Sequence, residues 1–94
     1  MKTINWNDEK NAALKKSRAV CFEDVVFYIE RGEILDDYAH PNQKSYPGQR
    51  IMVIGIDNYA YIVPYVENEE EIFLKTIIPS RKATQKYLGE NNED

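Results

Sequence analysis

Residues 50–78, RIMVIGIDNYAYIVPYVENEEEIFLKTII, decide the fold. They hold three apolar runs, Arg50–Ile56, Tyr59–Val66 and Glu71–Ile78, which are separated by two short polar turns. Runs rich in β-branched and aromatic residues with short turns between them are typical of β-hairpins. The stretch therefore predicts an antiparallel meander of three strands.

Two helices are predicted ahead of this meander. Asp8–Arg18 follows the N-cap candidate Asn7 and ends in basic residues, as the helix dipole favours. Phe22–Arg31 repeats apolar residues at helical spacing and meets a natural stop at Gly32.

The remaining segments complete an α+β pattern. Ile4–Trp6 reads as a brief edge strand and Ile34–Tyr38 as a further strand, with a loop at His40–Gln49. Ser80 is expected to cap a last helix that reaches Leu88. We expect one domain over residues 1–89, with the helices on one face of the sheet, and a disordered acidic tail at 90–94.

The strand pattern predicts one aliphatic and one aromatic sheet face. Side chains alternate along a strand, so the aliphatic faces are expected under the helices. The other face would then carry Tyr61, Tyr65, Phe73 and Lys75. Such a face suits single-stranded RNA, whose bases stack on aromatic rings, but it is also typical of a protein interface or of ordinary strand residues.

Composition points to a cytoplasmic protein. The chain has a single cysteine, Cys21, which excludes an internal disulfide framework and indicates a reducing compartment. Its first residues do not resemble a signal peptide, and no apolar run has the length that a membrane helix needs. We therefore expect no membrane partner.

Charge is unevenly distributed along this acidic chain. The net charge is −4, yet residues 1–18 hold five Lys or Arg against two acids, and residues 72–88 hold four against none. Local field decides where an anion docks, so both segments are candidate anion sites. The alternative is that each is a solvated helix face.

Few residues offer classical catalytic chemistry. One His and one Cys cannot build a structural metal site, and no phosphate-cradling glycine loop is present, so we expect no metal and no cofactor. Cys21 is either a buried structural residue or a thiol with a lowered pKa at a helix start. His40 is either a general acid or base or a surface residue.

The two ends of the chain resemble the BrnT family of bacterial toxins. That family's pattern opens with W-D-x-x-K-x-x-x-N-x-x-K-H-x-[IV]-x-F-E-x-A and closes with I-I-S-A-R-x-A-[ST]. Here WNDEKNAALKKSRAVCFEDVV, at residues 6–26, and the closing SRKAT, at residues 80–84, carry the resemblance. The matching residues are Trp6, Lys10, Lys15, Phe22 and Glu23 in the first motif, and Ile77, Ile78, Arg81, Ala83 and Thr84 in the second.

The resemblance implies a RelE-like fold and a metal-independent endoribonuclease that arrests translation. It also implies a cognate antitoxin with a ribbon-helix-helix module, and binding of operator DNA by the toxin–antitoxin complex only. Ser17-Arg18-Ala19 stands where the family has Lys-His-Gly, and Thr76 stands where the family often has an Arg. The missing His and the acidic net charge favour the alternative of a non-catalytic relative that binds a partner antitoxin or repressor.

The candidate site residues fall into two groups. For catalysis we expect Arg81 as the main phosphate contact, Lys75 as a second cation, and His40 or Glu23 as a proton carrier. RNA cleavage by the substrate's own 2′-hydroxyl needs such charge stabilisation and proton transfer. For RNA binding the candidates are the cations Lys15, Lys16 and Lys82 and the rings of Tyr61, Tyr65 and Phe73.

Overall fold

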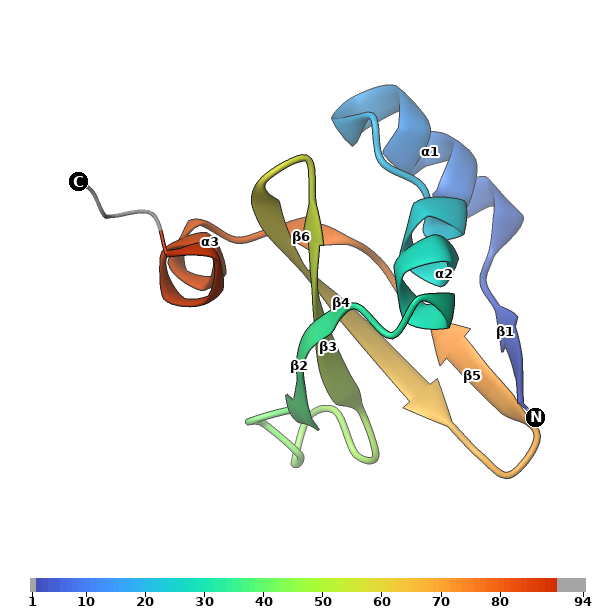
Figure 1. Ribbon diagram of the computed structural model, residues 1–94. Coiled ribbons are helices and arrows are strands. Elements are labelled where there is room, and N and C mark those ends of the chain that lie inside the picture. The colour runs from blue at the N-terminus through green and yellow to red at the C-terminus, as the bar shows by residue number, and fades with distance from the viewer. Residues whose placement is uncertain (1, 90–94) are drawn as a thin grey trace.

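The computed structural model describes residues 2–89, which form an α+β fold (Figure 1). The predicted disordered tail at 90–94 lies outside the described residues. The elements, in chain order, are β1 (Thr3–Asn5), α1 (Asp8–Arg18), α2 (Phe22–Glu30), β2 (Ile34–Ala39), β3 (Arg50–Ile56), β4 (Tyr59–Glu67), β5 (Glu71–Leu74), β6 (Ile78–Pro79) and α3 (Arg81–Leu88). The α+β prediction is confirmed, and no helix within residues 2–89 combines the length and the apolar composition needed to cross a membrane.

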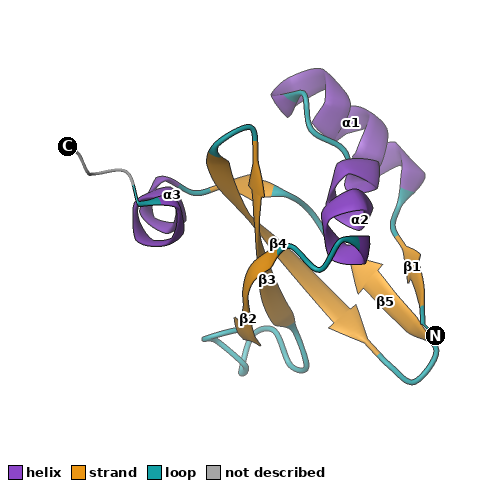
Figure 2. Ribbon diagram, in the orientation of Figure 1, coloured by secondary structure: helices purple, strands orange, loops and turns teal. Residues whose placement is uncertain are grey.

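The sheet has the strand order β1-β5-β4-β3-β2 (Figure 2). The pairs β2–β3, β3–β4 and β4–β5 are antiparallel, which confirms the predicted meander. β1 adds a parallel edge beside β5, and the two-residue β6 pairs with β4. The edges of this path are therefore β1 and β2.

A buried asparagine joins the first two helices. Asn11 of α1 is buried, and its Oδ1 accepts a 2.7 Å hydrogen bond from the backbone N–H of Phe22. Its Nδ2 donates a 2.8 Å hydrogen bond to Glu23 Oε1. Ala19 adopts a left-handed conformation with φ 57° and ends α1, so the chain turns sharply into α2.

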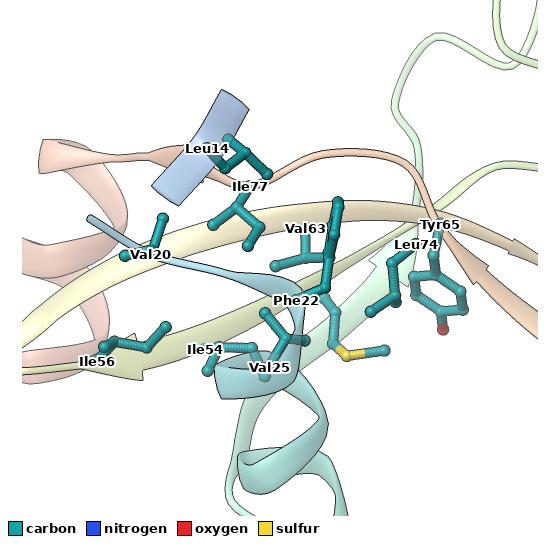
Figure 3. Packing of buried hydrophobic residues seen from close by; sticks show 11 residues of the cluster. Leu14, Val20, Phe22, Val25, Ile54, Ile56, Val63, Tyr65, Leu74 and Ile77 are labelled. Carbon is teal, nitrogen blue, oxygen red and sulfur yellow. The ribbon is translucent and has the colours of Figure 1, made fainter. Parts of the chain in front are cut away.

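The main core lies between α1, α2 and one face of the sheet (Figure 3). Phe22 and Val25 of α2 are fully buried against Ile54, Val63 and Leu74 of the sheet. Burying side chains of this size contributes about 1.5–3 kcal/mol each. The Trp6 ring extends this core by stacking on Phe22 with a centroid distance of 5.7 Å.

The third helix packs on the opposite face of the sheet (Figure 1). Ala83 lies against Val53 and Ala60, and the Thr84 hydroxyl accepts a 2.8 Å hydrogen bond from the Ala60 N–H. The predicted cap is present, since Ser80 Oγ accepts from the Ala83 N–H at 3.1 Å. The prediction that all helices share one sheet face is wrong, because α3 carries its own small apolar surface.

The predicted strand Glu71–Ile78 is broken into β5 and β6. Tyr65 pairs with Leu74 but Ile62 pairs with Ile78, so one extra residue is accommodated between them. Because of this bulge, the Ile77 side chain points to the same sheet face as Leu74 and packs in the same core. The Ile77 carbonyl accepts a hydrogen bond from the Arg18 guanidinium instead of a strand neighbour.

The predicted assignment of sheet faces is wrong for β4. Val63 and Tyr65 belong to the core beneath α1 and α2, and Tyr61 packs against it. Tyr65 lies opposite Leu74, whereas Phe73 lies opposite Val66 and therefore points to the other face. The β4 face that carries the tyrosines is the buried one, because its cross-strand neighbours are apolar: Ile54 lies opposite Tyr61, and Leu74 lies opposite Tyr65.

Candidate nucleic-acid interface

The sheet face that carries α3 is only partly covered. Tyr38, Ile51 and Pro64 form one cross-strand row on it, and the Lys75 N–H extends the row by donating a 2.8 Å hydrogen bond to the Pro64 carbonyl. α3 covers one end of β3 and β4 through Ala83 and Leu88. We call the rest of this surface, from Tyr38 across to Lys75, the open face: Tyr38 and Lys75 at its two sides are exposed, whereas Ile51 between them is buried.

A cavity of about 580 Å³ lies where α3 meets this open face. Its lining comes from edge strand β2, from the half-buried Ile62 of central strand β4, and from α3 with its N-cap. The lining residues are Asp36, Tyr38, Ile62, Ser80, Lys82, Ala83, Lys86 and Tyr87. Apolar surface with a few convergent polar groups is the usual composition of a ligand site.

Cations border the open face at two places. Lys82 and Lys86 are four residues apart on α3, so both reach the same side of the helix. Lys86 Nζ lies 5.1 Å from the Tyr87 ring centroid, and Lys75 Nζ lies 5.7 Å from the Phe73 ring centroid. Paired rings and ammonium groups are suited to bases and phosphates, respectively.

A tyrosine and a carboxylate close one side of the cavity. The Tyr87 hydroxyl donates a hydrogen bond to Asp36 Oδ2, and the Asp37 N–H donates to Asp36 Oδ1 at 2.8 Å. These two hydrogen bonds, with a smaller contribution from Lys86, hold the pKa of Asp36 below its ordinary value. The same contact with Asp36 raises the pKa of Tyr87. Asp36 is therefore ionised at neutral pH.

Arg81 lies at the start of α3, next to the cavity but not in its lining. Its side chain is exposed and makes no hydrogen bond or ion pair within residues 2–89. The neighbouring Lys82 does line the cavity. Of the predicted residues, Arg81, Lys82, Phe73 and Lys75 thus share this side of the molecule.

The predicted residues on α1 and α2 lie on the other side of the sheet. Lys15 and Lys16 are exposed on α1, so they do not join Arg81 and Lys82 in one cluster. Glu23 is held by Asn11, and this hydrogen bond is the main reason that the pKa of Glu23 is lowered. A carboxylate held in this way is a poor proton carrier.

Tyr61 and Tyr65 belong to the main core rather than to the open face. Tyr65 is 2% exposed, and its hydroxyl donates to the Asp37 carboxylate at 2.6 Å. Burial, followed by the hydrogen bond to Asp37, raises the pKa of Tyr65 to about 12. Arg50 completes this cluster through a 3.0 Å ion pair with Asp37. The Tyr65 ring therefore has no surface on which a base could stack.

His40 lies in the loop after β2 and outside the cavity lining. Its ring contacts Tyr46 with a centroid distance of 4.4 Å, and its Nδ1 accepts a 3.0 Å hydrogen bond from the Asn42 N–H. These contacts organise the loop between β2 and β3. The structure does not bring His40 together with Arg81 or Glu23.

Two positions singled out in the sequence have structural partners. Arg18, which stands where the BrnT pattern has a His, donates to the Ile77 carbonyl. Cys21 lies at the N-cap of α2, and burial is the main reason that its pKa is raised. The thiol is therefore not activated by the helix start.

Sequence reasoning missed Asp36, Tyr38, Lys86 and Tyr87 in the cavity lining. The spacing of Lys82 and Lys86 signalled one basic helix face, but the side of the sheet that this face meets depends on how α3 docks. Asp36 and Tyr38 lie on an edge strand whose partner across the cavity is remote in sequence. Among residues 2–89, no three Asp, Glu, His or Cys side chains gather into a group that could hold a metal ion.

Comparisons with protein-family models, with curated proteins and with solved structures find no match to this chain. The resemblance of the two end motifs to the BrnT family therefore stays a prediction.

Proposed function

We propose that this protein is the toxin of a type II toxin–antitoxin pair, a metal-independent endoribonuclease of RelE-like fold that inhibits translation in the cytoplasm. The observation that carries the proposal is the open face with its cavity, where Lys82, Lys86 and Lys75 border the rings of Tyr38, Tyr87 and Phe73. Aromatic rings interleaved with cations are suited to single-stranded RNA. The motif resemblance at residues 6–26 and 80–84 supports the same function.

The chemistry proposed uses the substrate's own hydroxyl. The 2′-oxygen attacks the adjacent phosphorus, a 2′,3′-cyclic phosphate forms, and the bond from phosphorus to the 5′-oxygen breaks. The 2′-hydroxyl proton passes to water, and a Lys82 or Lys86 ammonium supplies a proton to the leaving 5′-oxygen. Arg81, which has no competing ion pair within residues 2–89, stabilises the charge on the phosphate.

The partner that would restrain such a toxin is an antitoxin with a ribbon-helix-helix module. This part of the proposal rests on the family resemblance. In the same way, operator DNA would be bound by the toxin–antitoxin complex and not by the toxin alone.

Induced expression in a bacterial host tests this function. Wild type should arrest growth with loss of RNA, and Arg81→Ala should remove the arrest, because the phosphate contact is lost while an exposed side chain leaves the fold intact. Lys44→Ala, in the loop after β2, is the matched control and should stay toxic. Full toxicity of Arg81→Ala at equal protein level would refute the role of Arg81, and a folded wild type without any effect on RNA would refute the nuclease.

A second candidate is a non-catalytic protein that binds a partner through this fold. The net charge of −4 favours it, as does a second cavity of about 940 Å³ between β1 and α2, which Trp6, Val26, Ile29 and Ile72 help to line. This reading predicts a tight protein complex and intact RNA at every protein concentration.

A further inference from the structure

We propose that the cavity between α3 and β2 is a nucleobase pocket that selects guanine. Tyr38 would stack on the base, Asp36 would accept hydrogen bonds from its edge, and Lys82 and Lys86 would hold the neighbouring phosphates. This inference rests on the proposed function, because the base belongs to the bound RNA strand.

The walls of the cavity offer an aromatic ring and an apolar side chain to a flat ligand. Asp36 and Tyr38 are two residues apart on β2 and point to the same face of the sheet. Tyr38 is 38% exposed, so its ring offers a surface for stacking, and Ile62 supplies an apolar floor. The volume of about 580 Å³ lies within the range of roughly 300–1,000 Å³ that is usual for small-molecule sites.

Asp36 is fixed and still has acceptor capacity. Oδ2 receives the Tyr87 hydroxyl and Oδ1 receives the Asp37 N–H. Each carboxylate oxygen has two lone pairs, so one acceptor site remains on each oxygen. The two existing hydrogen bonds orient the carboxylate, and its lowered pKa keeps it an acceptor at neutral pH.

A fixed carboxylate distinguishes the four RNA bases. Guanine presents two adjacent donors, N1–H and the N2 amine, which match the two oxygens. Adenine and cytosine each offer a single exocyclic amine beside a ring acceptor, and uracil offers one N–H between two carbonyl oxygens. Those acceptors would face Asp36 and be repelled, so guanine is preferred.

The arrangement of charges supports a base near Asp36 and phosphates near the lysines. A phosphate placed against Asp36 would be repelled, whereas a neutral base is not. Lys82 is exposed on α3, and Lys86 lies 5.1 Å from the Tyr87 ring centroid. The cavity thus separates a site for a base on β2 from a site for backbone anions on α3.

Fluorescence anisotropy with short uridine-rich strands tests the pocket. The strands carry 2′-fluoro groups, which prevent cleavage, and differ at one central position that holds guanine, inosine, adenine, cytosine or uracil. Guanine should bind about tenfold more tightly than adenine or uracil, and inosine, which lacks the N2 amine, should lie between them. Tyr38→Ala should weaken every strand by about tenfold through lost stacking.

The variant Asp36→Asn tests guanine recognition without removing the side chain that holds Tyr87. It keeps an oxygen for the Tyr87 hydroxyl, gives up the acceptor of the exposed Asp37 N–H and removes a negative charge, so overall affinity should stay equal or rise while the guanine preference disappears. Asp8→Asn, on α1 beyond the other sheet face, removes the same charge and should keep the preference. Equal binding of all strands to wild type, or a guanine preference retained in Asp36→Asn, would overturn this inference alone. Failure of every strand to bind would overturn the proposed function as well.

Discussion

The Tyr87 hydroxyl, in the last turn of α3, donates a hydrogen bond to the Asp36 carboxylate on edge strand β2. In the middle of the helix, the Thr84 hydroxyl fixes α3 to β4 by accepting a hydrogen bond from the buried Ala60 N–H. These two contacts hold the helix across the sheet and define the cavity beside it. These two hydrogen bonds therefore contribute to the geometry of the candidate site, together with the packing of Ala83 and Leu88 on the sheet.

Tyr87→Phe should raise the pKa of Asp36 toward its ordinary value of 3.8, because the largest cause of its lowering is removed. A carboxyl with a lowered folded pKa stabilises the fold above its unfolded pKa, and this contribution is lost as pH falls through the folded pKa. The variant should therefore lose less stability on acidification below about pH 4. An NMR titration of the Asp36 carboxyl, with Tyr38→Phe as the control, measures the shift; an unchanged pKa would show that Tyr87 does not engage Asp36 in solution.

Thr84→Val should loosen α3, because the buried Ala60 N–H loses its acceptor. An unsatisfied buried donor costs about 1–3 kcal/mol. Urea unfolding gives the size of the loss, and amide hydrogen exchange at Ala60 should accelerate. Thr76→Val, whose hydroxyl makes no hydrogen bond within residues 2–89, should be near neutral; equal effects of the two variants would contradict the anchoring role.

Tyr65→Phe should destabilise the fold by about 1–2 kcal/mol at neutral pH, because its part-buried hydroxyl bonds the charged Asp37. The raised pKa of Tyr65, about 12, also predicts how this contribution to stability changes at alkaline pH. Stability from this group is complete below the unfolded pKa of about 10 and is lost as pH rises from there toward 12. The variant should therefore show a smaller decline between pH 10 and 12.

Unfolding curves of this variant at neutral and at alkaline pH supply the comparison. Tyr59→Phe is the matched control, because its hydroxyl makes no hydrogen bond within residues 2–89. A decline in alkali as steep in Tyr65→Phe as in wild type would assign the alkaline loss to other groups.

The double variant Lys82→Ala, Lys86→Ala should weaken RNA binding and reduce its dependence on salt. Each phosphate contact on a single strand contributes about 0.7 to the slope of log affinity against log salt, so the slope should fall by about 1.4. The double variant Lys15→Ala, Lys16→Ala makes the same change of charge on α1 and should keep the slope. Affinities measured over a series of salt concentrations decide between the two basic segments, and the reverse result would move the interface to α1.

Most of the helices and strands could be predicted from short-range features of the sequence. The caps Asn7 and Ser80, the apolar spacing of α2 and the short turns of the meander each act within a few residues, so helices and strands followed from the sequence. The sheet faces did not follow, because which face of β4 is buried depends on cross-strand neighbours such as Leu74. In the bulge before β6 the Ile77 carbonyl accepts from Arg18, which lies far away along the chain, so no local pattern indicates this contact.

The site shows the same division between local and distant information. Lys82 and Arg81 were identified from one motif and one strand end, and both lie at α3. Asp36 and Tyr87 meet across the cavity although they are 51 residues apart, and nothing local in either segment indicates that contact. Tyr65 was misplaced because a strand tyrosine carries no sign of the core that buries its ring or of the Asp37 carboxylate that accepts its hydroxyl.

The most direct test is incubation of the purified protein with a single-stranded RNA in the presence of EDTA. The account predicts products that end in a 2′,3′-cyclic phosphate, no cleavage where a 2′-deoxy nucleotide replaces the attacking residue, and a large loss of rate in Lys82→Ala, Lys86→Ala but not in Lys15→Ala, Lys16→Ala. RNA that stays intact at every concentration of folded protein, or cleavage that survives 2′-deoxy substitution, would contradict it.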